Sequence, residues 1–204
     1  MMSQTIYVVI KTLLLKLISY NPRLKNKMQQ TKHIYLRLIN EKDVDFLLEL
    51  RLNQNLNKYL NQINNDKELQ LNWLKNYKYR EANGTDFYFV IVDKQAGDIG
   101  LVRVYDVDYA NKSFTWGSWI IREENRPKYA AIESALLSLN FAFNELNLVV
   151  GNIDVRIDNL KADNFYRRFG MIYKYCDDVN NYFKLTKNKY TQLKYNQYYK
   201  FLLN

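Results

Sequence analysis

Cysteine, histidine, glycine and proline are all scarce in this 204-residue chain, which contains one Cys, one His, six Gly and two Pro. A lone Cys176 cannot build an internal disulfide framework, and Cys176 with His33 alone cannot form a zinc site. We therefore expect a protein of a reducing compartment, cytoplasmic and without a metal centre. The length fits one domain, or one domain with appendages.

Long hydrophobic runs are also missing, since crossing a bilayer takes about 20 apolar residues. The segment Tyr7 to Ile18 is apolar with helical spacing, but Lys11 and Lys16 interrupt it. No basic region precedes it and no small-residue cleavage site follows, which argues against a signal peptide. We expect residues 1–30 to be a helical extension that packs on the domain or on a second subunit, giving a homodimer. A membrane-surface helix is the alternative.

Acidic residues are outnumbered, with 21 Asp and Glu against 30 Lys and Arg, a net charge of +9. Such a charge suits an anionic partner, either nucleic acid or a small polyanion such as a nucleotide cofactor. The basic residues are scattered rather than gathered in a run, so we expect no nucleic-acid partner. A merely solvated basic surface is the alternative.

Apolar spacing and turn residues predict the elements in the order β-α-α-β-β-β-α-β-α-β. That order indicates an α/β (α+β) fold over residues 31–204, with a mixed, mostly antiparallel sheet flanked by helices and a C-terminal helix. A ligand would bind at the open end of the sheet. The predicted strands are 34–38, 86–92, 98–105, 113–121, 148–156 and 182–185, and the predicted helices are 41–51, 66–80, 129–146, 160–169 and a last one from about 191.

Two motifs carry the chemistry. The first, Arg126-Pro-Lys-Tyr-Ala-Ala131, opens the long helix, where free N–H groups favour an anion. The second follows the next strand and has Asn159, Ala162, Tyr166 and Gly170 spaced as Asn-x-x-Ala-x-x-x-Tyr-x-x-x-Gly, followed by Met171. With the element order, these motifs resemble the GCN5-related N-acetyltransferase family from His33 to about Leu185.

The resemblance implies transfer of an acetyl group from acetyl-CoA to a primary amine. It implies that Asn159 bonds the pantetheine amide region and that Tyr166 protonates the departing thiolate. It further implies that the pantetheine pairs with the backbone of the strand 116–121, which splays from its neighbour. Gly117 predicts a bulge or a close backbone approach there. The implied cofactor-binding residues are Ile120, Ile121, Arg122, Arg126, Lys128, Tyr129, Ala130, Ala131, Asn159 and Arg168.

The general base is not supplied by the family pattern. Many members carry a Glu at the start of the central strand, where this chain has Thr115. The carboxylates expected nearest the acceptor are Asp106 and Asp108, which could take the amine proton directly or through water. Glu133 is a weaker candidate, and loop capping is the alternative role for the two aspartates.

The segments Phe114–Trp119 and Lys128–Leu136 resemble the branch of the family that serves surface-glycan synthesis. This resemblance implies an acceptor that is an amino-deoxysugar linked to UDP or dTDP. Cationic and aromatic side chains would bind such a dianion. The candidates are Arg51, Lys58, Trp73, Arg103 and Tyr105. Acetylation of a protein N-terminus or lysine is one alternative, and a non-catalytic module that binds acyl-CoA or nucleic acid is another.

Overall fold

The computed structural model describes residues 29–124 and 126–201, and in these residues the strands form one eight-stranded sheet of order β1-β2-β3-β4-β5-β6-β8-β7. All neighbours are antiparallel except β5 and β6, which are parallel. The predicted helical extension lies outside the described residues. The strands are β1 (Gln29–Gln30), β2 (Ile34–Leu38), β3 (Phe87–Asp93), β4 (Gly97–Asp108), β5 (Ser113–Ile121), β6 (Val150–Arg156), β7 (Ile172–Cys176) and β8 (Asn180–Thr186).

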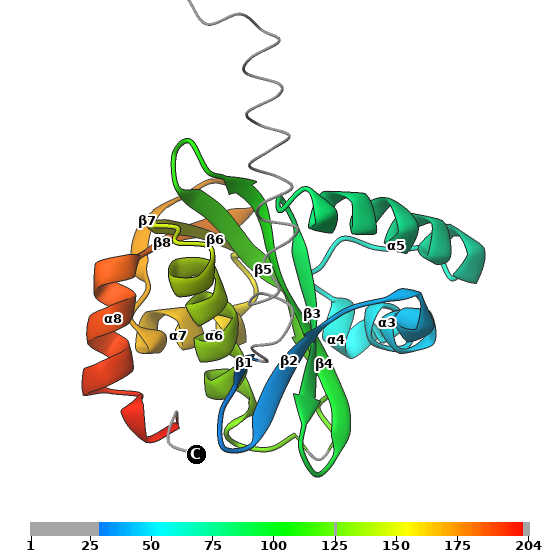
Figure 1. The fold of residues 1–204 in the computed structure, drawn as a ribbon, viewed down its shortest axis with the longest axis horizontal. Coiled ribbons are helices and arrows are strands. Elements are labelled where there is room, and N and C mark those ends of the chain that lie inside the picture. Colours follow the sequence, from blue (N-terminus) through cyan, green and yellow to red (C-terminus); the bar gives the residue numbers. More distant parts are fainter. Residues whose placement is uncertain (1–28, 125, 202–204) are drawn as a thin grey trace, which may run out of the picture.

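The helices cover the two faces of this sheet (Figure 1). On one face lie α3 (Val44–Leu52), α4 (Gln54–Asn57) and α5 (Lys67–Ala82), preceded by the 3₁₀ turn η1 (Glu41–Asp43). On the other lie α6 (Ala130–Asn140), α7 (Leu160–Phe169) and α8 (Lys187–Asn196). A π-helical turn, η2 (Phe141–Glu145), continues α6, and the short η3 (Tyr199–Phe201) follows α8. The predicted mixed sheet with flanking helices and a C-terminal helix is confirmed.

Strand β3 shows how the two cores form. Every residue from Phe87 to Asp93 is buried. Alternate side chains of a strand point to opposite faces, and here both faces are covered by helices. Phe87, Phe89 and Ile91 enter the core under α6, α7 and α8, whereas Tyr88, Val90 and Val92 enter the core under α3 and α5.

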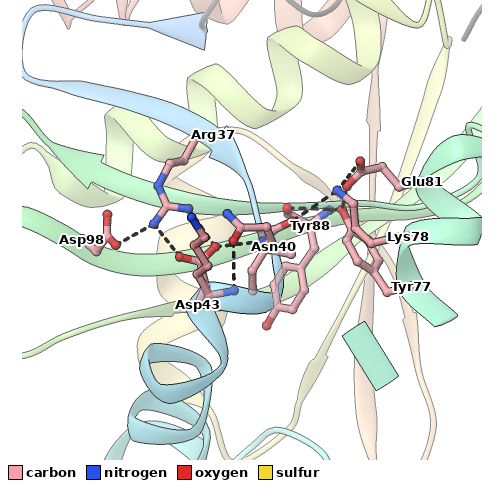
Figure 2. A network of polar contacts seen from close by, with 10 residues as sticks. Arg37, Asn40, Asp43, Tyr77, Lys78, Glu81, Tyr88 and Asp98 are labelled. Atoms are coloured by element: carbon pink, nitrogen blue, oxygen red, sulfur yellow. Dashed lines mark hydrogen bonds and ion pairs between the residues drawn. The ribbon is translucent and has the colours of Figure 1, made fainter. Parts of the chain in front are cut away.

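Polar contacts fix α3 and α5 on their face of the sheet (Figure 2). Arg37 on β2 donates to both carboxylate oxygens of Asp43 at 2.8 Å and to Asp98 on β4 at 2.6 Å. Asn40 is the N-cap of η1 and forms a capping box with Asp43. On α5, the Tyr77 hydroxyl accepts the backbone N–H of Tyr88 at 2.8 Å. These contacts hold α3 and α5 against the sheet.

The central strand β5 pairs with β6 only from Ser113 to Thr115, so the predicted splay is confirmed. The predicted irregularity near Gly117 is also confirmed. Leu101 on β4 pairs with Ile120 and Arg103 with Gly117, so β5 carries an extra residue there, and Ser118 adopts a φ of 47°. The backbone beyond Thr115 is therefore free of β6.

Most predicted elements are confirmed within a few residues. The last helix starts at Lys187 instead of near residue 191, because Thr186 caps it by accepting the N–H of Lys189. Three short elements were not predicted: β1, α4 and β7.

Gly170 ends α7 in the left-handed region, at a φ of 99°. A Cβ here would lie 2.8 Å from both terminal carbons of Leu193 on α8. We expect Gly170→Ala to lower the free energy of unfolding by about 2 kcal/mol, from backbone strain plus overpacking. Gly97 is the matched control, since its φ is 79° but nothing lies within 4 Å of a Cβ. Gly97→Ala should cost only about 1 kcal/mol of strain. Equal losses in urea unfolding would contradict the packing contribution.

Candidate active site

A cavity of about 480 Å³ opens on the α3/α5 face of the sheet, a size typical of small-molecule sites. One wall comes from α3, α4, α5 and the loop between α4 and α5, and the floor comes from β3, β4, β5, β6 and β8. The Tyr59 hydroxyl in that loop donates to the carbonyl of Asp158 at 3.0 Å, so the loop reaches the rim beside β6. The polar and aromatic lining residues include Arg51, Trp73, Tyr88, Arg103, Tyr105, Ser118, Asp154, Arg156, Asn159 and Tyr166.

The cavity reaches residues from both faces of the sheet. Asn159, Ala162 and Tyr166 belong to α7 or its cap, on the face opposite α3, yet they line the same cavity as Arg51. The route follows from the splay of β5 and β6, because a fully paired sheet would separate the two sides. A donor approaching through the splay would meet an acceptor from the α3 side.

Tyr166 lies where the two sides meet. Its side chain is 5% exposed and packs against Trp116 and Phe183 at ring separations of 5.9 and 5.7 Å. Burial raises the pKa of Tyr166 well above that of a free phenol, and the negative charge of Asp154 adds to this effect. The phenol is therefore neutral at pH 7 and can donate a proton into the cavity.

Two buried polar atoms at the cavity, the Nε of Arg51 on α3 and the hydroxyl of Tyr88 on β3, make no hydrogen bond of normal geometry with the described residues. Burial raises the pKa of Tyr88, and the neighbouring Arg51 opposes that rise. Another nitrogen of Arg51 donates to the carbonyl of Asn61 at 2.6 Å, which holds the guanidinium at the cavity edge. Buried polar groups are nearly always hydrogen-bonded in native proteins, so this pair suits a ligand with oxygen atoms.

Trp73 of α5 lies against two arginines. The guanidinium carbons of Arg80 and Arg103 lie 5.4 and 5.5 Å from its ring centre. Both arginines bind the buried carboxylate of Asp86, at 2.9 and 2.5 Å. Arg103 also lies over the ring of Tyr105, at 4.6 Å. Arg103 is thus an ion-paired wall residue rather than a free cation.

Asp154 is the cavity residue that the sequence analysis missed. Among the described residues it is the sole carboxylate in the lining, where it accompanies Arg51, Arg103 and Arg156. Although its side chain is exposed, the cavity walls partly desolvate it. This desolvation raises the pKa of Asp154, Arg156 opposes the rise and Asp177 adds to it. The charge of Asp154 in turn helps to raise the pKa of Tyr105 to about 12, second to burial.

The predicted anion site at the start of α6 lies apart from the cavity lining. No side chain caps this helix, so its first N–H groups lack a side-chain acceptor. Arg126 and Lys128 are exposed beside it, and Ala130 is fully buried. The side chain of Tyr129 is engaged elsewhere than at this anion site. Its ring stacks on His33 at 4.0 Å between ring centres, and its hydroxyl donates to Asp93 at 2.6 Å.

The other predicted binding residues are dispersed. Arg122 forms a two-pronged ion pair with Glu49 of α3, and Lys58 lies over the Tyr59 ring outside the lining. Asn159 caps α7 by accepting the Ala162 N–H, which leaves its amide group to donate. Arg168 is exposed on α7. Ile120 and Ile121 are buried on β5. Ala131 on α6 is partly buried and packs against the core between the sheet and α6.

The predicted bases are not brought to the cavity. Neither Asp106 nor Asp108 is among its lining residues. Asp108 caps the turn after β4 by accepting the N–H groups of Ala110 and Asn111, and these bonds lower its pKa. Glu133 is fully buried under the β1–β2 turn, where it accepts from the Thr31 hydroxyl and contacts His33 Nδ1 at 2.7 Å.

The family model of the acetyltransferase (GNAT) domain matches residues 33–172. A search of curated proteins found no match. Among solved structures, apo FdhC, described as a nucleotide-linked sugar GNAT, is 39% identical. Their superposition has a TM-score of 0.79 and covers 87% of this chain and 99% of FdhC.

Two further structures share the fold at lower identity. Spermidine N-acetyltransferase from Vibrio cholerae, in complex with CoA and spermine, is 22% identical, with a TM-score of 0.68 and coverage of 78% of this chain and 98% of that one. A GCN5-related N-acetyltransferase from Brucella melitensis is 17% identical, with a TM-score of 0.68 and coverage of 82% of each chain.

Proposed function

The chain belongs to the acetyltransferase (GNAT) family, and from that premise we propose that this N-acetyltransferase acts on the amino group of a nucleotide-linked amino-deoxysugar. The observation that carries the proposal is the charge of the cavity. Apart from Arg103, whose charge is paired with Asp86, its lining holds Arg51 and Arg156 against Asp154, and this positive balance suits the diphosphate of a nucleotide sugar. The likeness to FdhC supports the same acceptor class.

A polyamine fits this cavity poorly. Spermidine is a polycation, and cationic substrates are drawn to clefts lined by carboxylates. Here Arg51 and Arg156 face the cavity with Asp154 as the single counter-charge among the described lining residues. We therefore propose that this chain shares its fold with the spermidine acetyltransferases but takes a different acceptor.

Arg51, Tyr88 and Trp73 form the proposed acceptor wall. The Nε of Arg51 and the Tyr88 hydroxyl would donate to phosphate or sugar oxygens of the acceptor. Trp73 lies in the same lining, where its ring already stacks on Tyr77, and would contact a base or sugar. Arg103, held by Asp86, keeps that ring in place.

Acetyl-CoA is the donor and supplies an acetyl thioester with an electrophilic carbonyl carbon. The residues of this chain fit such a donor. The backbone of β5 beyond Thr115 is free of β6 and can pair with an amide-containing arm, as the resemblance implies. The uncapped start of α6, with Arg126 and Lys128 beside it, suits the pyrophosphate. Tyr166 holds its phenolic proton where the two substrates meet.

The test is a panel of acceptors: dTDP- and UDP-linked amino-deoxysugars, spermidine and a lysine peptide, read by free thiol release from acetyl-CoA. We expect kcat/KM for at least one nucleotide sugar to exceed that for spermidine by about 100-fold or more, roughly two well-made charged hydrogen bonds. Arg51→Glu should raise the KM for that nucleotide sugar about tenfold or more while acetyl-CoA affinity is retained.

The matched control is Lys75→Glu, which makes the same change of charge on the exposed surface of α5. It should leave KM nearly unchanged. Preference for spermidine or the peptide, or equal effects of the two charge reversals, would contradict the proposed acceptor.

A further inference from the structure

We infer that Asp154 is the group that removes the proton from the acceptor amine. The inference concerns the N-acetyltransferase reaction itself and does not depend on which amine is the acceptor. It starts from the cavity, in which Asp154 is the sole carboxylate among the described lining residues. It lines this cavity together with Tyr166 and Tyr105.

The position of Asp154 follows from the alternation of β6. Ile153 and Val155 are buried in the core under α6 and α7, so Asp154 and Arg156 project to the opposite face. Helices α3 and α5 pack on β2, β3 and β4 at that face, and over β6 the cavity takes their place.

Its backbone is also held firmly. Strand β6 pairs with β8 along its whole length, and Asp154 is in register with Tyr182. On the other side, pairing with β5 ends at Asn152, two residues earlier. Asp154 therefore sits on a rigid strand at the point where the splay opens, which is where an amine and a thioester arriving from opposite faces would meet.

The charged and titratable groups around Asp154 fit a base. Tyr105 on β4 and Tyr166 on α7 both have their pKa raised by its negative charge, so the three groups share one electrostatic site. Arg156 on β6 favours the carboxylate and Asp177 near β8 disfavours it. Desolvation gives a net rise in the pKa of Asp154, which makes its carboxylate a stronger base than that of an ordinary aspartate.

The other candidates are occupied elsewhere. Asp108 is used in a turn cap, and Asp106, like Asp108, is outside the lining. Glu133 is fully buried among Thr31 and His33, beneath β1 and β2. No comparable contact with another described residue ties down the carboxylate of Asp154.

Asp154 takes one proton from the ammonium group, which frees the nitrogen lone pair. The nitrogen–carbon bond forms and the carbon–sulfur bond breaks, with its electron pair leaving on sulfur. Tyr166 gives its proton to that thiolate, and the second amine proton restores the phenol. Asp154 then releases its proton to solvent through the open cavity, so one proton is liberated per acetyl group transferred.

The test compares Asp154→Asn with Asp154→Glu, using whichever amine of the panel above the wild type acetylates best. We expect Asp154→Asn to lower kcat/KM by about 100-fold or more at neutral pH, the usual contribution of a general base. In the wild type, kcat/KM should fall as pH drops through the raised pKa of Asp154, because protonation removes the base. Asp154→Asn should lose this inflection, and Asp154→Glu should keep it with partial activity.

A measurement without an acceptor separates this inference from the proposed substrate. In NMR spectra of protein labelled at the aspartate carboxyl carbons, the signal lost in Asp154→Asn should titrate above the ordinary aspartate pKa of about 3.9. Asp178→Asn, in the exposed turn before β8, is the matched control and should keep full activity. Acetyl-CoA affinity should be unchanged in every variant.

Full activity of Asp154→Asn, an unaltered pH profile or a carboxyl that titrates below the ordinary value would overturn the assignment. So would an Asp106→Asn variant that is inactive while Asp154→Asn is active. Rejection of nucleotide sugars by the wild type, with acetylation of another amine, would remove the proposed acceptor and leave the role of Asp154 intact.

Discussion

Tyr166→Phe is expected to lower kcat by about 100-fold or more while acetyl-CoA binds with nearly unchanged affinity. The substitution removes one hydroxyl and leaves the ring among Trp116, Trp119 and Phe183. Packing is therefore preserved, and the variant lacks only the hydroxyl proton that the leaving thiolate needs. Steady-state kinetics and calorimetry with acetyl-CoA measure the two effects separately.

The pH dependence gives this prediction a second readout. Burial first, then the charges of Asp154 and Tyr105, raise the pKa of Tyr166 above that of a free phenol. The acid form is therefore present throughout the range below a free phenol's pKa of about 10, and wild-type kcat should not decline there through loss of the proton. Tyr79→Phe is the matched control, because Tyr79 is 72% exposed on α5. Full turnover in Tyr166→Phe would remove this residue from the mechanism.

The position of Tyr166 in the site could be predicted from the sequence, because it depends on the spacing of residues within one short motif. Asn159, Tyr166 and Gly170 lie on or at the ends of one amphipathic helix, α7, whose cap, buried face and left-handed terminus are all encoded within a dozen residues. The same holds for β5, whose alternating apolar residues Phe114 and Trp116 face one core. Local periodicity is the part of a fold that a single sequence reveals best.

Asp154 and β7 depend on tertiary context instead. Which face of β6 meets the cavity is decided by where α3 and α5 stop covering the sheet and by the splay from β5, and neither is encoded near Asp154. Strand β7 is an edge strand whose five residues are all exposed, so it lacks the alternation that marks a half-buried strand. Asp106 and Asp108 looked close to the acceptor because they end β4, but the turn uses Asp108 as a cap.

The ion pair between Arg103 and Asp86 could not be predicted from the sequence either, because it also depends on tertiary context. Arg103 and Asp86 lie 17 positions apart in the sequence, and their contact follows from the register in which Tyr88 on β3 pairs with Arg103 on β4. The register brings a cavity-lining arginine to a carboxylate that is 3% exposed. A residue assigned to substrate binding from its charge thus also belongs to a buried ion-pair network that supports the cavity wall.

Asp86→Ala should accordingly be strongly destabilising. It would leave Arg103, 19% exposed, and Arg80, 39% exposed, without their shared carboxylate. Breaking a buried ion pair by removing one partner costs about 3 kcal/mol, the lower end of the known range, since both arginines keep some contact with water. For a chain of this length that corresponds to a fall in Tm of about 6 to 12 °C, measurable by calorimetry.

Asp45→Ala is the control that isolates burial. Asp45 pairs with Lys67 at 2.7 Å, but their side chains are 72% and 55% exposed, so its removal should cost less than about 1 kcal/mol. The network also reaches the acceptor wall, because Arg80 and Arg103 both lie over Trp73. Asp86→Asn, which keeps the shape and removes the charge, should therefore raise the acceptor KM while acetyl-CoA affinity holds. Equal Tm shifts in Asp86→Ala and Asp45→Ala would show that the network contributes nothing beyond a surface pair.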